Sequence, residues 1–158
     1  MNVELRPFSS DNQDFLFQLY ASTRIHEIAP FGWSPPQQEA FLRVQFNAQQ
    51  GWYQQAYPQA DHQIIFAEDQ PIGRILVAQE AAGTRLVDIA LLPEYRGRGI
   101  GTQLIRQLIE QATQVGSVVH LHVLRTNPAI HLYERLGFVK TSEDQMYYQM
   151  ERTTSNSS

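Results

Sequence analysis

The chain has 158 residues, of which 42% are hydrophobic and 18% charged, and its formal net charge is −4 at pH 7. This length favours one domain, and we expect a single domain over residues 1–152. The acidic balance argues against nonspecific binding to nucleic acids or membrane surfaces, since both require a basic surface. The sequence contains no cysteine, which excludes disulfides, thiolate metal sites and a cysteine nucleophile.

The first third of the chain is predicted to contain one strand and two helices. Residues 3–5 form a short strand, and a helix through Leu19 follows it. Three residues are candidate N-caps of this helix: Ser9, Ser10 and Asp11. A second helix, rich in glutamine, is predicted over residues 36–57, with a weak point at Gly51. Four apolar residues recur in it at helical spacing: Phe41, Val44, Ala48 and Trp52.

Strands are predicted in the middle of the chain, over residues 63–68, 73–79 and 85–92. Residues 68–71, Glu-Asp-Gln-Pro, have a turn composition and lie between the first two strands. We therefore expect these two strands to form an antiparallel hairpin.

Helices and strands alternate in the rest of the chain. An apolar stripe predicts a helix over residues 102–113, with Gly116 at its C-terminal cap. The later elements are a strand at 117–124, a short helix from Asn127 and Pro128 to Gly137, and strands at 138–140 and 146–150. This order predicts an α/β fold with a mixed sheet, in which strands 85–92 and 117–124 run parallel. The tail, 153–158, is predicted to be disordered.

A glycine-rich turn precedes the predicted helix at 102–113, within the stretch PEYRGRGIGTQLI. A strand that runs through such a turn into a helix leaves unpaired N–H groups at the positive end of a helix dipole, which suits a phosphate. No lysine follows, so the Walker A motif is excluded, and Gly97, Gly99 and Gly101 lack the dinucleotide-binding spacing G-x-G-x-x-G. The alternative is a tight turn whose glycines only accommodate positive φ.

Two motifs together resemble the GNAT acetyltransferase superfamily. The first is Arg-x-x-Gly-x-Gly at Arg96, Gly99 and Gly101, and the second is NPAIHLYERLGF at residues 127–138. The resemblance extends over residues 86–138. It implies a GNAT-like fold, with a mixed, partly parallel central sheet flanked by helices. It also implies acetyl-CoA as cosubstrate.

The resemblance implies which residues contact the coenzyme. The loop that would hold the pyrophosphate comprises Arg96, Gly97, Arg98, Gly99, Ile100, Gly101 and Thr102. The backbone of Ile89, Ala90 and Leu91 would face the acetyl carbonyl and the pantetheine amide, where this strand splays from the next parallel strand. Asn127 is a further candidate, although it precedes Tyr133 by six residues where the family usually has seven. An N-cap is its alternative role.

Acetyl transfer needs a nucleophilic amine, an oxyanion stabiliser and an acid for the departing thiolate. The absence of cysteine favours direct attack in a ternary complex. Tyr133 is the candidate acid, with a core aromatic as its alternative role. His122 and Asp88 are candidate bases, although His120 lies on the same strand face as His122 and the two histidines could form a structural pair.

The acceptor site would lie near Glu27 and Trp33, whose alternative roles are a solvated loop residue and a core aromatic. A small molecule or a peptide remains open as the source of the amine. No metal, nucleic-acid partner or membrane partner is expected, and a homodimer is left open. No signal-peptide pattern or membrane-spanning apolar run is found, so we expect a cytoplasmic protein.

Two functions from different classes are compatible with these residues. The leading prediction is an N-acetyltransferase that moves an acetyl group from acetyl-CoA to a primary amine. The main alternative is a noncatalytic module that binds or senses acyl-CoA, which would keep the glycine loop and need no proton-transfer groups.

Overall fold

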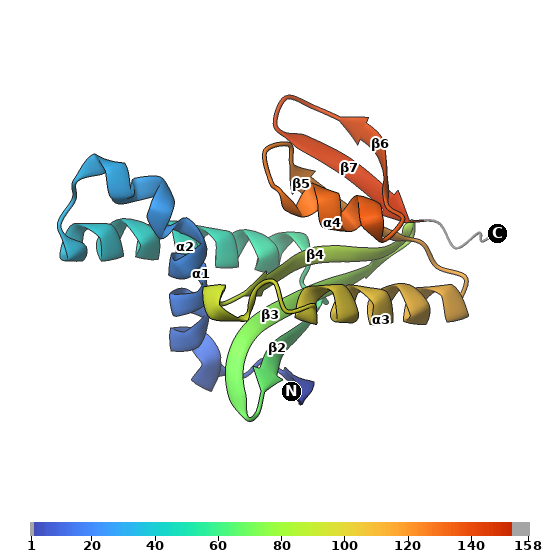
Figure 1. The fold of residues 1–158 in the computed structure, drawn as a ribbon, viewed down its shortest axis with the longest axis horizontal. Coiled ribbons are helices and arrows are strands. Elements are labelled where there is room, and N and C mark those ends of the chain that lie inside the picture. The colour runs from blue at the N-terminus through green and yellow to red at the C-terminus, as the bar shows by residue number, and fades with distance from the viewer. Residues whose placement is uncertain (1, 153–158) are drawn as a thin grey trace. The chain divides into compact units, whose positions relative to one another are not determined.

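The computed structural model describes residues 2–152, and within them seven strands form one mixed sheet flanked by helices (Figure 1). The strands are β1 (Val3–Pro7), β2 (Asp61–Ala67), β3 (Gln70–Glu80), β4 (Gly83–Leu91), β5 (Val119–Leu124), β6 (Val139–Glu143) and β7 (Tyr147–Arg152). The helices are α1 (Gln13–Ile28), α2 (Pro35–Ala56), α3 (Ile100–Gln114) and α4 (Ala129–Arg135). The predicted disorder of the tail 153–158 lies outside the described residues.

The strand order is β1-β2-β3-β4-β5-β7-β6. β4 and β5 pair in parallel, with Thr84 opposite Val119 and Arg85 opposite His120. β1 pairs with β2, and β7 pairs with both β5 and β6, in antiparallel fashion. The prediction of a mixed sheet with a parallel pair at these two strands is confirmed.

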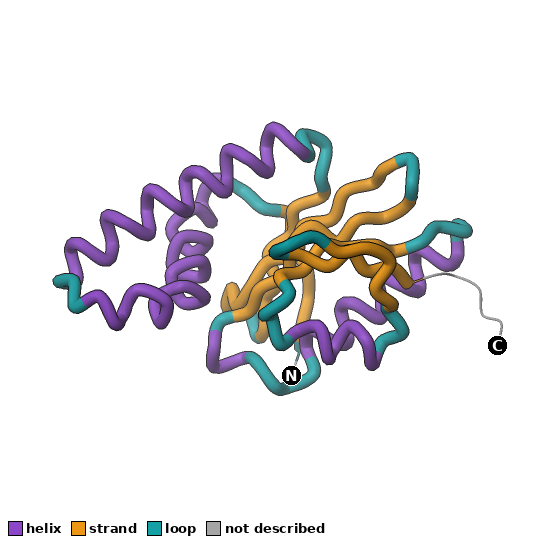
Figure 2. Tube along the Cα trace, turned by 90° about the horizontal axis from the view of Figure 1, so that it is seen from above, coloured by secondary structure: helices purple, strands orange, loops and turns teal. Residues whose placement is uncertain are grey.

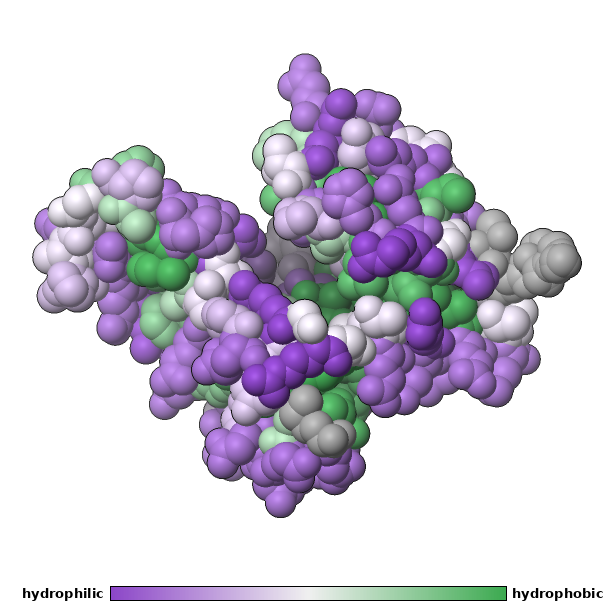
Figure 3. Space-filling view, in the orientation of Figure 1, coloured by the Kyte–Doolittle hydropathy of each residue, from purple (hydrophilic) through white to green (hydrophobic). Residues whose placement is uncertain are grey.

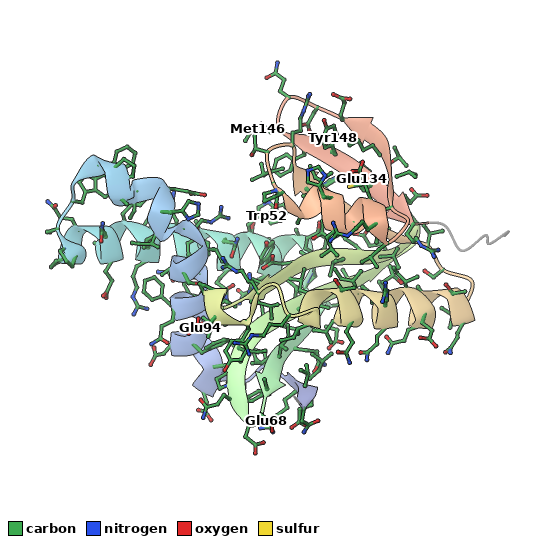
Figure 4. The ribbon with its side chains drawn as sticks, viewed as in Figure 1. Trp52, Glu68, Glu94, Glu134, Met146 and Tyr148 are labelled. Atoms are coloured by element: carbon green, nitrogen blue, oxygen red, sulfur yellow. The ribbon has the colours of Figure 1, made fainter. Side chains whose placement is uncertain are left out.

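The β2–β3 hairpin is confirmed, but its turn is shorter than the sequence suggested. Only Glu68 and Asp69 form the turn, with φ of 50° and 67°, and Figure 4 shows Glu68 at its tip. Two residues with positive φ are typical of the turns whose twist matches that of paired strands. Gln70 and Pro71 already belong to β3, so the predicted four-residue turn is wrong.

The described chain divides into two compact units. One comprises the residues up to Leu76 together with Ile89–Arg96, and the other comprises Val77–Asp88 together with the chain from Gly97 onward. The single domain expected from the sequence stays a prediction.

Helices α1 and α2 pack against each other in the first unit (Figures 1 and 2). A 3-10 turn, Ser10–Asn12, precedes α1, and Asn12 is the N-cap of the helix. The predicted caps therefore belong to this turn rather than to α1. At α2, Ser34 is the N-cap, and its N–H donates to Gln37 Oε1 at 2.9 Å. The core of this unit consists of Leu16, Phe17, Leu19, Ile28, Leu42, Phe46 and Ile64.

The helical prediction for α2 is confirmed, but the predicted apolar face is not the buried one. Leu42 and Phe46 are buried, whereas Val44 is 69% exposed and Trp52 is 56% exposed. Hydrophobic side chains accordingly show between hydrophilic ones on the surface of the helix pair (Figure 3). Gly51 lies within the continuous helix, so the expected weak point does not interrupt it.

The second unit contains α3, whose apolar stripe and C-terminal glycine are as predicted. Leu104, Ile105, Leu108 and Ala112 are buried, and Gly116 has φ of 70° after the last turn. α3 begins two residues earlier than predicted, at the buried Ile100. Within residues 2–152, no helix is both long enough and apolar enough to span a membrane.

Candidate active site

The glycine-rich turn begins the helix α3. β4 ends at Leu91, a 3-10 turn at Pro93–Tyr95 follows, and Gly99 is the N-cap of α3 with φ of 82°. Gly97 has φ of 73°. This left-handed conformation is adopted readily only by glycine. Both glycines therefore accommodate positive φ, as the sequence predicted for a tight turn.

The surface of the turn is open at its glycines. A Cβ atom added to Gly97, Gly99 or Gly101 would meet no heavy atom within 4 Å. The first intrahelical bond of α3 runs from the N–H of Gln103 to the carbonyl of Gly99, at 3.0 Å. The N–H groups of residues 100–102 precede that bond, and the N-terminal N–H groups of a helix have no intrahelical partners. Open backbone with these donors fits an anionic group such as a pyrophosphate.

Two arginines, Arg96 and Arg98, belong to the turn. The Nε–H of Arg96 donates to the carbonyl oxygen of Leu91 at 3.0 Å. Arg96 therefore ties the turn back to the last residue of β4 in addition to carrying positive charge. Arg98 is exposed between Gly97 and Gly99. Both arginines place positive charge beside the open N–H groups of the turn.

The other predicted coenzyme residues lie at the end of β4 and at the start of α3. Ile89, Ala90 and Leu91 are half-buried residues of β4. Gly101 and Thr102 are half-buried in the first turn of α3. The structure thus gives each of these segments regular secondary structure, and their contacts with the coenzyme stay predictions.

Tyr133 is buried in α4. Its side chain is 8% exposed, and its ring packs against that of Phe138 with centroids 5.7 Å apart. Burial raises the pKa of Tyr133 to about 12, and the negative charge of Asp88 contributes in the same direction. The phenol therefore keeps its proton at neutral pH and can act as a hydrogen-bond donor.

The side chain of Asn127 bonds to the start of the helix that carries Tyr133. Its Oδ1 accepts a hydrogen bond from the N–H of Ala129 at 2.8 Å, and α4 begins at Ala129. The N-cap of α4 is Pro128, so the predicted N-cap position of Asn127 is one residue too early, although the side chain of Asn127 does bond to the helix start. Its contact with the coenzyme stays a prediction.

The two histidines of β5 lie on one strand face but have different surroundings. His120 is buried, with Nε2 3.4 Å from Glu80 Oε1. Burial and the charge of Arg85 lower the pKa of His120, against the opposing effects of Glu80, Glu151 and the backbone of Gly83. His122 is exposed, and its ring centroid lies 6.3 Å from that of Tyr147.

The predicted acceptor residues lie on the first unit. Glu27 is exposed in the last turn of α1, with its Oε2 3.5 Å from Arg24 NH1. Trp33 is half-buried between Phe31 and Phe41, at centroid distances of 5.2 and 5.1 Å. Trp33 also packs against the core of this unit, so its alternative role as a core aromatic is observed. Its contact with an acceptor stays a prediction.

The β6–β7 hairpin carries a polar cluster that the sequence did not single out. Asp144 Oδ1 accepts hydrogen bonds from the N–H groups of Met146 and Tyr147, which lower the pKa of Asp144. Arg125 NH1 donates to the carbonyl of Asp144 at 2.9 Å, and its guanidinium lies over the ring of Tyr148. An aspartate three residues before a strand is a recognisable turn signal, but its partner Arg125 is distant in sequence.

Between residues 2 and 152, no group of three or more His, Asp or Glu side chains is placed to hold a metal ion. The expectation that no metal is used stays a prediction.

The chain is similar to known acetyltransferases in sequence. A model of the acetyltransferase (GNAT) family matches residues 22–138. Streptothricin acetyltransferase of Streptomyces lavendulae is 38% identical over 90 residues, covering 54% of this chain and 47% of that protein. The ribosomal protein bS18-alanine N-acetyltransferase of Haemophilus influenzae is 33% identical over 85 residues, covering 53% and 58%. The chain thus spans about half the length of the curated relatives it matches.

The fold is similar to that of solved acetyltransferases over nearly the whole chain. PaiA N-acetyltransferase from Thermoplasma acidophilum, in complex with coenzyme A, has a TM-score of 0.74 at 22% identity, covering 97% of this chain and 99% of that one. The ribosomal-protein-S18-alanine N-acetyltransferase from Escherichia coli has a TM-score of 0.65 at 17% identity, covering 99% and 97%. The predicted fold class is confirmed.

Proposed function

Because the chain belongs to the acetyltransferase (GNAT) family, we propose that it transfers the acetyl group of acetyl-CoA to a primary amine. The open glycine turn at the start of α3 carries this proposal, since it leaves backbone N–H groups accessible at the positive end of a helix dipole. A structure with this fold in complex with coenzyme A supports acetyl-CoA as the donor.

We assign two backbone segments to the coenzyme. The N–H groups of residues 97–102 would bind the pyrophosphate, and Arg96 and Arg98 would add positive charge beside it. The main chain of residues 89–91 would bind the pantetheine amide and stabilise the oxyanion that forms on the acetyl carbonyl. Main-chain donors are independent of the side chain at each position, so single substitutions there remove no donor.

The proposed reaction is a direct transfer in a ternary complex. The amine nitrogen attacks the thioester carbonyl carbon, and the carbonyl oxygen takes up negative charge in a tetrahedral intermediate. The carbon–sulfur bond then breaks, the coenzyme leaves as a thiolate, and the amine nitrogen gives up a proton. No covalent intermediate on the chain is required, in line with the absence of cysteine.

The environment of Tyr133 favours hydrogen bonding over full proton transfer to this thiolate. With its pKa at about 12, Tyr133 would give its proton to a thiolate whose conjugate acid has a pKa of about 8.5. That transfer is uphill by roughly 5 kcal/mol. A hydrogen bond from the phenol to the developing thiolate stabilises the charge without it. We therefore assign Tyr133 the role of hydrogen-bond donor to the leaving group.

The base that accepts the amine proton is proposed from two residues. His122 is exposed on β5, and histidine is the side chain that most often acts as a general base. Asp88 is half-buried on β4, and its charge already acts on Tyr133. We favour His122 for this role. A proton taken up by Asp88 would remove the negative charge that helps to raise the pKa of Tyr133.

The acceptor is proposed to be the amino group of a small molecule or a peptide. Two of the curated relatives carry streptothricin and a ribosomal-protein alanine in their names, which supports both classes of amine. Glu27 would attract a cationic amine, and Trp33 would contact its apolar part. A cytoplasmic location and a homodimer stay predictions.

Acetyl-CoA turnover with a panel of amines tests this function. The panel comprises alanine-terminated peptides, polyamines and amino-group-containing antibiotics, and free thiol release is followed together with the mass of the product. We expect thiol release that depends on at least one amine. Binding of coenzyme A without turnover on any class of amine would favour the noncatalytic acyl-CoA module instead.

A further inference from the structure

A buried glycine of β3 lies against the end of β4. A Cβ atom added to Gly73 would lie 2.8 Å from Leu91 Cδ2 and closer still to the carbonyl oxygen of Ala90. Carbon and oxygen ordinarily meet at 3.3–3.6 Å even in weak CH···O contacts. Any side chain at position 73 would therefore push against the main chain of β4.

The need for glycine at position 73 comes from space and not from backbone conformation. Gly73 is absent from the residues of the described chain that have positive φ, so its backbone is one that alanine adopts readily. Gly97 and Gly99 of the coenzyme turn show the opposite pattern, because both have positive φ and a Cβ on either would meet nothing within 4 Å. Gly73 is thus required by its neighbours.

The neighbouring backbone is held in the same place by a hydrogen bond. The N–H of Leu92 donates to the carbonyl of Ile72 at 2.8 Å, and Ile72 is fully buried. Contacts from Ile72 and Gly73 therefore fix residues 90–92, just before the chain enters the turn at Pro93–Tyr95. These residues overlap the segment that we assign to the thioester end of the coenzyme.

We propose that Gly73 is a positioning residue for coenzyme binding. The close approach that it permits sets the path of the backbone at Ala90 and Leu91, and so aims the main-chain groups that would bind the acetyl carbonyl and the pantetheine amide. This inference rests on the proposed function. An alanine at position 73 would displace β4 on the order of 1 Å, and a misplacement of that size can reduce the rate about 100-fold.

The test compares Gly73→Ala with Gly51→Ala. Gly51 lies in α2 of the same unit, has ordinary φ, and has nothing within 4 Å of an added Cβ. We expect coenzyme A, measured by calorimetry, to bind Gly73→Ala at least tenfold more weakly than wild type, with Gly51→Ala unchanged. We also expect kcat/KM for acetyl-CoA to fall in Gly73→Ala. Wild-type coenzyme affinity in folded Gly73→Ala would overturn the proposal.

Amide hydrogen exchange at Leu92 separates this proposal from the proposed function. Displacement of β4 should lengthen the Leu92 to Ile72 bond and speed exchange at Leu92 in Gly73→Ala. Unchanged exchange there would overturn the positioning role, whereas failure of wild type to bind coenzyme A would overturn the proposed function. If Gly73→Ala does not fold, the double variant Gly73→Ala/Leu91→Ala takes its place. It removes the side-chain contact with Leu91 and keeps the contact with the Ala90 carbonyl. The same expected loss of affinity and the same contradicting results apply to the double variant. Full rescue of coenzyme affinity by Leu91→Ala would also contradict a backbone effect.

Discussion

The side chain of Asn127 accepts a hydrogen bond of 2.8 Å from the N–H of Ala129, at the start of the helix that carries Tyr133. Asn127→Ala removes this acceptor and leaves an N–H at the helix start without its partner. We expect the free energy of unfolding to fall by about 1 kcal/mol, as is usual when a side-chain acceptor at a helix start is lost. Chemical denaturation of wild type and Asn127→Ala measures this change in the free energy of unfolding.

Asn127→Asp is the matched control for this change, because aspartate keeps the capping oxygen. We expect it to retain wild-type stability, since an acidic group is also favourable at a helix N-terminus. Unchanged stability of Asn127→Ala would contradict the capping role. A stable Asn127→Asp with weakened coenzyme binding would instead place Asn127 in contact with the coenzyme.

Tyr133→Phe keeps the ring in its packing against Phe138 and removes the hydroxyl. If the phenol stabilises the leaving thiolate, single-turnover acetyl transfer should slow about 100-fold, as is typical for loss of a donor to a developing charge. Coenzyme affinity and thermal stability should change little, because the ring stays in place. Wild-type turnover in this variant would return Tyr133 to the role of a core aromatic.

His120 makes the stability of the protein depend on pH. Burial and Arg85 lower its pKa in the folded chain, while Glu80, Glu151 and the backbone of Gly83 act in the opposite direction. An unfolded histidine begins to bind a proton at a pH near its ordinary value of 6.5. As the pH falls through that value, the unfolded state takes up a proton before the folded state does, so stability decreases.

The comparison of His120→Gln with His122→Gln isolates this effect. Denaturant unfolding is measured at about pH 7.5 and about pH 5.5, roughly one unit either side of the ordinary histidine pKa. The loss of stability between these two pH values should be smaller in His120→Gln than in wild type. His122 is exposed on the same strand face, so His122→Gln should lose as much as wild type. An unchanged pH dependence in His120→Gln would contradict the assignment.

Features that depend on neighbouring residues in the chain were predictable from the sequence. The apolar stripe of α3 and the glycine at its C-terminal end both follow from local rules. The parallel pair β4 and β5 followed from a strand, helix and strand in succession. The coenzyme turn was identified through family resemblance, since its glycines alone also suit an ordinary tight turn.

Features that depend on residues distant in sequence were missed. Phe46 and not Trp52 is buried on α2 because α1 packs against that side, and the spacing of apolar residues fits either choice. Gly73 gave no signal, because its requirement arises only when the Ala90 carbonyl lies against it. The pKa of Tyr133 likewise depends on burial in the folded unit and on Asp88.

The central claim is that the turn before α3 binds the coenzyme, and calorimetric titration of coenzyme A into Gly99→Val and Gly116→Val tests it most directly. The two glycines flank the same helix, have φ of 82° and 70°, and have nothing within 4 Å of an added Cβ. Valine should therefore strain both positions alike. We predict at least tenfold weaker binding in folded Gly99→Val and wild-type binding in Gly116→Val. Wild-type affinity in Gly99→Val, or an equal loss in both variants, would contradict the account.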